Sequence, residues 1–239
     1  MQGSMPMKGQ SFISRFLREI ELPESIRFCI WRLMASEERE ADMNIQVRTS
    51  SGITLVPLET RLMAGRKIFL EGEINQAAAV EIVRKVMLLN MEDAKKPIDV
   101  LINSPGGEVN AGMLIYDVIQ AQAAPVRMFC VGRAYSMAAV LFACGGHGRY
   151  ILPHSRLMLH EPLIGNQVEG SASSIKSISE SLLETKQKLN EILAKHTART
   201  IAEIEEATAF DHYYSAQESV DFGLADRIVN FDAIMAGSE

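Results

Sequence analysis

The sequence predicts an α/β fold in which most strands pair in parallel. From residue 67 onward, short apolar segments typical of strands alternate with segments whose apolar residues have helical spacing. Each strand and the helix after it take roughly 30 residues, the length of a β-α-β unit. The composition, 47% hydrophobic and 23% charged over 239 residues, is that of a globular protein able to bury a sizeable core.

The individual elements follow from apolar periodicity and from the turn residues between them. Strands are expected over residues 67–70, 98–102, 126–131, 149–152, 156–160 and 227–229. Helices are expected over residues 77–89, 109–119, 137–144, 170–195, 200–207 and 215–223.

Two of these helices carry additional signals. The last one begins with a capping box, Ser215 with Glu218 three residues on, and ends at Gly223. The long helix over residues 170–195 has only a narrow apolar stripe between Ser, Lys and Glu residues. A narrow stripe on a long helix predicts contact with another subunit rather than a wall of the core.

The N-terminal region differs from the rest of the chain. Between residues 12 and 34 its apolar residues are interrupted by Pro23, and a charged run follows at residues 37–40. We expect residues 1–42 to be an extension that is flexible or removed by processing, followed by one domain over residues 43–239. Residues 43–63 are expected to be extended around a hairpin turn at residues 50–52.

Charge and cysteine content narrow the class of protein. The formal net charge of −6 argues against nucleic acid or an anionic membrane as partner, because both attract clustered Lys and Arg. The odd count of three cysteines and the absence of a CxxC pair argue against a disulfide framework or a zinc site, and Cys130 and Cys144, which lie in apolar runs, are expected to be buried thiols. The chain has no apolar run long enough for a membrane span and no secretory pattern, which predicts a cytoplasmic protein.

Four segments contain candidate catalytic residues. Ser136 lies between an apolar strand and an apolar helix, where free N–H groups favour an oxyanion, although a plain helix cap explains this position too. Gly106 and Gly107, in the run Ser-Pro-Gly-Gly, supply exposed backbone N–H groups. The run lacks the Lys and the spacing of a phosphate-binding loop, so these N–H groups suit a neutral or transiently anionic oxygen better than a phosphate. His160 ends a strand, at the edge where active residues of parallel sheets gather. Asp211 lies just before two tyrosines, where a carboxylate suits the orientation of a histidine. A structural histidine and an exposed loop aspartate are the alternatives.

Together these segments resemble the Clp protease proteolytic subunit (ClpP) family, peptidase S14. The matching blocks, in order, are Ser-Pro-Gly-Gly, Gly-x-x-x-Ser-Met-Ala-Ala, Leu-His-Glu-Pro and Asp-His-Tyr-Tyr-Ser-Ala-x-Glu-Ser-Val-x-Phe-Gly-Leu-Ala-Asp. The spacings from Ser136 to His160 and from His160 to Asp211 are also similar to those of the family. The resemblance covers most of the chain, from residue 43 to residue 229.

The resemblance implies the β/α superhelix of ClpP and the crotonases, with a protruding helical handle over about residues 163–198. It also implies a serine peptidase domain over residues 43–239. Its catalytic triad would be Ser136 as nucleophile, His160 as base and Asp211 as the acid that orients the base.

The same resemblance implies further site residues and partners. Gly107 and the N–H of Met137 correspond to the oxyanion hole, and Val109 and Leu163 fall on the strands that hold an extended substrate by β-addition. The family's subunits form two stacked seven-membered rings, a tetradecamer, around a chamber. An AAA+ Clp-type ATPase feeds unfolded polypeptides into it and consumes the ATP, so no cofactor is expected in the chain itself.

Three residues depart from the family pattern. Tyr135 precedes the nucleophile where a small residue is usual, Glu161 stands where Gln is common, and Phe210 replaces an Arg that pairs across rings. Three alternatives therefore remain: an inactive or structural subunit of a mixed ring, an acyl-CoA enzyme of the crotonase type, and a membrane-linked peptidase that works without an unfoldase. The complete Ser/His/Asp set favours a serine endopeptidase.

Overall fold

The computed structural model describes residues 44–50, 52–165 and 169–235, and the chain divides into two compact units, Met1–Arg61 and Leu62–Glu239. The predicted extension over residues 1–42 and the predicted domain start at residue 43 lie outside the described residues.

The described part of the first unit contains an antiparallel hairpin. Strand β1 (Asn44–Thr49) pairs with β2 (Gly52–Pro57), which confirms the predicted hairpin. The expectation that the chain stays extended to residue 63 is wrong, because α3 (Leu58–Ala64) follows β2 directly. Its sequence, Leu-Glu-Thr-Arg-Leu-Met-Ala, consists mainly of residues with high helix propensity.

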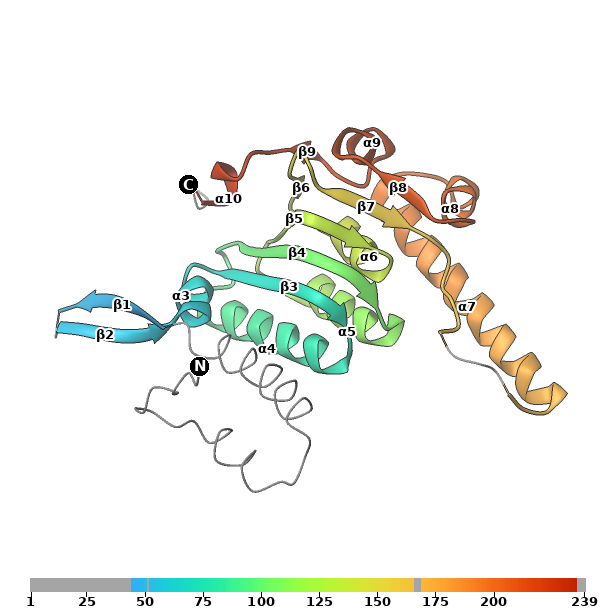
Figure 1. The fold of residues 1–239 in the computed structure, drawn as a ribbon, viewed down its shortest axis with the longest axis horizontal. Helices are drawn as coiled ribbons and strands as arrows, with labels where there is room; N and C mark the ends of the chain where they lie inside the picture. The colour runs from blue at the N-terminus through green and yellow to red at the C-terminus, as the bar shows by residue number, and fades with distance from the viewer. Residues whose placement is uncertain (1–43, 51, 166–168, 236–239) are drawn as a thin grey trace, which may run out of the picture. The chain divides into compact units, whose positions relative to one another are not determined.

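The second unit is built on a mostly parallel sheet, which confirms the predicted α/β class (Figure 1). The β7–β8 pair is antiparallel, whereas the other pairs of this sheet are parallel. Strand β8 was not predicted, since three residues are too few to show a period. In the described residues the sheet has seven strands, in the order β3 (Lys67–Ile74), β4 (Ile98–Gly107), β5 (Val126–Tyr135), β6 (Arg149–Ile151) and β9 (Arg227–Ile228), with β7 (Arg156–Leu159) paired to β5 and to β8 (His212–Tyr214).

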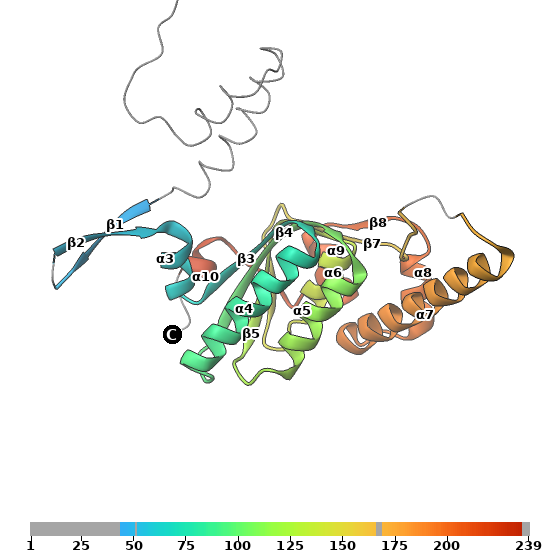
Figure 2. The same cartoon turned by 90° about the horizontal axis from the view of Figure 1, so that it is seen from below.

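Hydrophobic clusters lie on both faces of this sheet, as the alternation of side chains along a strand requires. Val100 and Ile102 of β4 belong to the large core cluster, whereas Leu101 between them packs with Phe129 and Ile234 on the opposite face. Figure 2 shows the helices α4 (Gln76–Glu92) and α5 (Val109–Ala121) side by side on the face of the large cluster. The short helix α10 (Asp232–Met235) carries Ile234 and therefore covers part of the other face.

The C-terminal third is helical, as predicted. The elements are α7 (Ala172–Thr197), α8 (Ile201–Thr208) and α9 (Ala216–Phe222), and the capping box of Ser215 with Glu218 is present at the start of α9. Gly223 ends α9 with φ 92°, the left-handed conformation that favours glycine. Among the helices in the described ranges, none has both the length and the apolar composition that crossing a bilayer requires.

The long helix α7 extends beyond the sheet, as the predicted handle does (Figures 1 and 2). Its buried side chains lie only in the C-terminal part, from Leu189 to Thr197. In the N-terminal part, Ile175, Ile178 and Leu183 are exposed. One half of the helix is thus anchored in the core, and the other half presents apolar side chains to its surroundings.

Candidate active site

Ser136 lies directly after β5, at the first turn of α6 (Met137–Ala143). Its backbone N–H donates a 2.8 Å hydrogen bond to the carbonyl oxygen of Met158 in β7, which ties the end of β5 to its neighbour. Its φ of 54° and ψ of −125° are unusual for a residue with a Cβ. Backbone strain of this kind occurs at functional sites, where surrounding contacts hold the residue in place.

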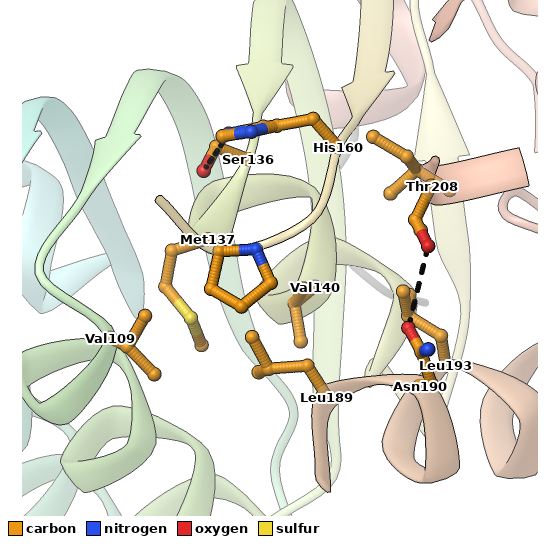
Figure 3. A pocket seen from close by; sticks show the side chains of 11 residues that line it. Val109, Ser136, Met137, Val140, His160, Leu189, Asn190, Leu193 and Thr208 are labelled. Atoms are coloured by element: carbon orange, nitrogen blue, oxygen red, sulfur yellow. Dashed lines mark hydrogen bonds between the residues drawn. The ribbon is translucent and has the colours of Figure 1, made fainter. Parts of the chain in front are cut away.

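His160 is the first residue after β7, and its ring contacts Ser136. Strands β5 and β7 are parallel neighbours in which Tyr135 pairs with Met158, so their carboxyl ends meet at one edge of the sheet. Nε2 of His160 lies 2.8 Å from Oγ of Ser136 (Figure 3). The Ser136 side chain makes no capping hydrogen bond to α6, so this contact, and not a plain helix cap, accounts for its orientation.

Asp211 comes close to His160 along the backbone but does not contact it. Strand β8 runs antiparallel to β7, and their last pair is His212 opposite Leu159, so Asp211 and His160 each lie one residue beyond that pair. The Asp211 side chain is exposed. Nδ1 of His160 is buried, and no group in the described part of the chain forms a hydrogen bond with it.

The Ser-Pro-Gly-Gly segment, called the glycine loop below, forms the irregular end of β4 and lies against the nucleophile candidate. A Cβ on Gly106 would stand 2.6 Å from the carbonyl oxygen of Tyr135 and 2.7 Å from Cβ of Ser136, and φ of Gly106 is 95°. The loop is held by Ser104, whose Oγ accepts from the N–H of Gly106 at 3.1 Å. A Cβ on Gly107 would overlap the backbone of Ile74 in β3. Both glycines are therefore required for the close approach of this loop to its neighbours.

The two predicted substrate residues do not lie on strands. Val109 is the first residue of α5, because the chain leaves β4 at Gly107 and the carbonyl of Glu108 already accepts from the N–H of Gly112 at 3.0 Å. Leu163 lies in an irregular, exposed segment after β7. The strand assignment of both residues is therefore wrong, although Val109 still faces the space beside Ser136.

That space is a hollow, partly open to solvent, that is lined by residues of α5, α6, β7, α7 and α8 and by the segments next to them. Met137 forms one wall of the hollow, and Gly112 leaves room for its side chain, since a Cβ on Gly112 would lie 2.6 Å from Cε of Met137. The residues that line the hollow are Val109, Ser136, Met137, Val140, Leu159, His160, Pro162, Leu189, Asn190, Leu193 and Thr208 (Figure 3).

Sequence reasoning missed seven of these eleven lining residues, among them Asn190 and Thr208. Both are polar and almost completely buried. The only signal available was a polar residue inside the apolar stripe of α7, where Asn190 stands among Leu189, Ile192 and Leu193.

The residues that depart from the resemblance are the sequence neighbours of Ser136, His160 and Asp211. The ring of Tyr135 packs edge-on against Tyr213, with 5.6 Å between centroids, and Phe210 is 87% exposed. Glu161, next to His160, forms an ion pair with Lys186 of α7, with 2.5 Å between Oε2 and Nζ. This ion pair joins the segment that carries the histidine to the long helix.

The described residues contain no activated cysteine and no cluster of possible metal ligands. Burial raises the pKa of Cys130 and of Cys144 to about 12, so both thiols are protonated, as expected of cysteines that pack as small apolar residues. Within residues 44–50, 52–165 and 169–235, no three His, Cys, Asp or Glu side chains gather as metal ligands would.

A protein-family model described as Clp protease matches residues 51–232, which is well over half of the chain. The match spans the glycine loop, Ser136, His160 and Asp211, and the α/β fold with its mostly parallel sheet agrees with it. The chain therefore belongs to the Clp protease family.

Proposed function

We propose that this chain is a serine endopeptidase of the ClpP type, with Ser136 as the nucleophile and His160 as the general base. The observation that supports this proposal most is the 2.8 Å separation between Oγ of Ser136 and Nε2 of His160. A hydroxyl nucleophile needs a base within hydrogen-bond reach to remove its proton during attack. Membership of the Clp protease family supports the same chemistry.

In the proposed reaction, Oγ of Ser136 attacks the carbonyl carbon of the scissile peptide while its proton passes to Nε2 of His160. The C–N bond then breaks, and His160 returns the proton to the leaving amine. Water attacks the resulting ester, gives a proton to His160 and releases the carboxylic acid product. His160 finally returns that proton to Oγ of Ser136, which restores the enzyme.

The oxyanion of the tetrahedral intermediate would be bound by the N–H groups of Gly107 and Met137. The close approach of Gly106 to Ser136 supports this assignment, because it brings the glycine loop next to the reacting atom. Met137 is the first residue of α6, and an N–H at that position has no acceptor within its own helix. Val109 and Leu163 would contact the substrate.

Asp211 is proposed as the third member of the triad. The buried Nδ1 of His160 has no partner in the described residues, and a carboxylate at this nitrogen would fix the tautomer in which Nε2 accepts the serine proton. Asp211 and His160 each follow directly on the last pair of β7 and β8, which supports the proposal that a change in side-chain conformation would bring the two together. Replacement of Asp211 by Asn is expected to lower kcat at least about 100-fold, since the asparagine amide favours the wrong tautomer. Unchanged kcat would remove Asp211 from the mechanism.

The proposal extends to assembly and partners. The exposed apolar residues Ile175, Ile178 and Leu183 of α7 are suited to contact other subunits, in line with stacked heptameric rings around a chamber. An AAA+ Clp-type ATPase would deliver unfolded polypeptides to that chamber, and the chain itself would need no cofactor. A cytoplasmic setting is part of the proposal, and the free thiols Cys130 and Cys144 fit a reducing compartment.

Labelling with a fluorophosphonate, followed by mass spectrometry of the modified peptide, tests the catalytic part. We expect the label on Ser136, its loss in Ser136→Ala, a strong decrease in His160→Ala, and retention in the matched control Ser181→Ala on the exposed face of α7. An assembled, folded sample that is labelled at no serine would refute the peptidase proposal and favour an inactive subunit of a mixed ring. Native mass spectrometry tests the assembly, and a chain that stays monomeric at micromolar concentration would refute the chamber.

A further inference from the structure

The hollow beside Ser136 has apolar walls and one polar end. Asn190 and Thr208, from α7 and α8, form that end and are 3% and 2% exposed (Figure 3). Nδ2 of Asn190 is buried, and no group in the described part of the chain accepts a hydrogen bond from it. Buried amide donors normally have a hydrogen-bond partner, so an unpaired one beside walls that are mainly hydrocarbon requires an explanation.

Thr208 does not satisfy the Asn190 amide. Oγ1 of Thr208 lies 2.9 Å from the carbonyl oxygen of Ile204 and 3.5 Å from Oδ1 of Asn190. A hydroxyl has one proton, and the shorter contact within α8 is the better hydrogen bond. Asn190 thus lines the hollow with an amide whose N–H groups have no partner in the described residues.

The occupant follows from the position of the hollow. Ser136 and His160 both line it, so a side chain on the residue that supplies the acyl group can enter it during attack. Apolar contacts with Val140, Leu189 and Leu193 favour a hydrocarbon stem. Once that stem displaces water from the hollow, the Asn190 amide gains a partner only if the side chain carries an acceptor near its end.

We propose that Asn190 makes this hollow selective for an acyl-side residue with an unbranched side chain that ends near a hydrogen-bond acceptor. Methionine and glutamine are natural side chains of this shape, the first with a weak sulfur acceptor and the second with a carbonyl oxygen. The inference rests on the proposed peptidase function and adds to it the chemistry of substrate selection. Asn190 acts in this selection as a specificity residue and takes no part in bond breaking.

Three peptides that differ in one atom test the proposal. Their acyl-side residue is norleucine, methionine or O-methylhomoserine, which have the same length but a methylene, a sulfur or an ether oxygen at the same position. The measured quantity is kcat/KM, expressed as the ratio of the O-methylhomoserine peptide to the norleucine peptide. In the wild-type chain we expect a ratio of one or more. A purely apolar hollow would instead give a ratio several-fold below one, because the ether is less hydrophobic than the methylene of norleucine.

The variant Asn190→Leu keeps a similar volume and removes the donor. We expect it to lower the ratio about fivefold to tenfold, the usual effect of one hydrogen bond between uncharged groups. Ser181→Ala on the exposed face of α7 is the matched control, because Ser181 does not line the hollow, and it should leave the ratio within about twofold of wild type. A ratio that is the same in wild type and Asn190→Leu, or that falls equally in both variants, would overturn the proposal.

The wild-type ratio keeps the test independent of how well Asn190→Leu folds. If wild type prefers norleucine about tenfold or more, Asn190 does not select an acceptor and the inference fails. Cleavage of the norleucine peptide by wild type, and its loss in Ser136→Ala, is the separate evidence for the proposed peptidase. A chain that cleaves none of the three peptides would refute the peptidase function, and the inference would fall with it.

Discussion

Replacement of Gly106 by Ala tests how closely the glycine loop approaches Ser136. The added methyl would meet the carbonyl oxygen of Tyr135 at 2.6 Å, Cβ of Ser136 at 2.7 Å and the nitrogen of Met137 at 3.1 Å. These atoms belong to the backbone or lie next to it, so relief requires the loop or the start of α6 to shift. The change therefore acts directly on the position of the proposed nucleophile.

The expected loss of stability has two parts. Alanine at a φ of 95° costs about 1–2 kcal/mol, because its Cβ crowds the following carbonyl. Overpacking a filled site adds about 1–3 kcal/mol. We therefore expect the free energy of unfolding to fall by about 2–5 kcal/mol. A shift of Ser136 approaching 1 Å would also lower kcat/KM about 100-fold, since misplacement on this scale disrupts attack geometry.

Two other glycines separate these contributions. Gly72 has a φ of 68° but nothing within 4 Å of an added Cβ, so Gly72→Ala should cost only the conformational part, about 1–2 kcal/mol. Gly146 has open space and no left-handed φ, so Gly146→Ala should leave stability unchanged or raise it by up to about 1 kcal/mol. Urea unfolding followed by circular dichroism, peptide hydrolysis and the rate of fluorophosphonate labelling measure the three variants. The reasoning is refuted if Gly106→Ala is as stable as Gly72→Ala and as active as wild type.

Two further predictions concern α7. Lys186→Met should lower kcat several-fold, because the ion pair of Lys186 with Glu161 holds the residue next to His160. It should change the free energy of unfolding by less than about 1 kcal/mol, because a partly exposed ion pair contributes little to stability. The charge swap of Glu161→Lys with Lys186→Glu should restore kcat in the peptide assay, and a swap no better than the single variant would contradict this role. Burial, helped by the charges of Lys195 and Arg149, lowers the pKa of His196, so the unfolded chain takes up protons first as the pH falls. The free energy of unfolding should therefore decrease below about pH 6.5, and His196→Gln should flatten this decrease in urea titrations, whereas an unchanged slope would assign it to other groups.

Much of the fold could be predicted from the sequence because its signals are local. Apolar periodicity predicted the strands and helices of the parallel sheet, and the structure confirms their order. The capping box of Ser215 with Glu218 was equally readable, since it depends on residues three positions apart. Helix α3 and strand β8 were missed because they are short and their periods are not distinctive.

The candidate residues of the site could be identified from motifs, but their contacts could not. Ser136 and His160 are 24 residues apart, and they meet only because β5 and β7 are parallel neighbours that end at the same edge. Val109 shows the limit of the resemblance, which implied a strand there, whereas apolar periodicity predicted a helix from residue 109 and the structure confirms it.

Sequence by itself determined the α/β class, the family resemblance and the residue types available for catalysis, since each depends on local order along the chain. Tertiary structure alone decided the distance between Ser136 and His160, the separation of the Asp211 side chain from that histidine, and the unpaired amide of Asn190 in the hollow. These features depend on how distant segments pack and on which side-chain conformation the packing allows. Spacing along a sequence carries no information about either.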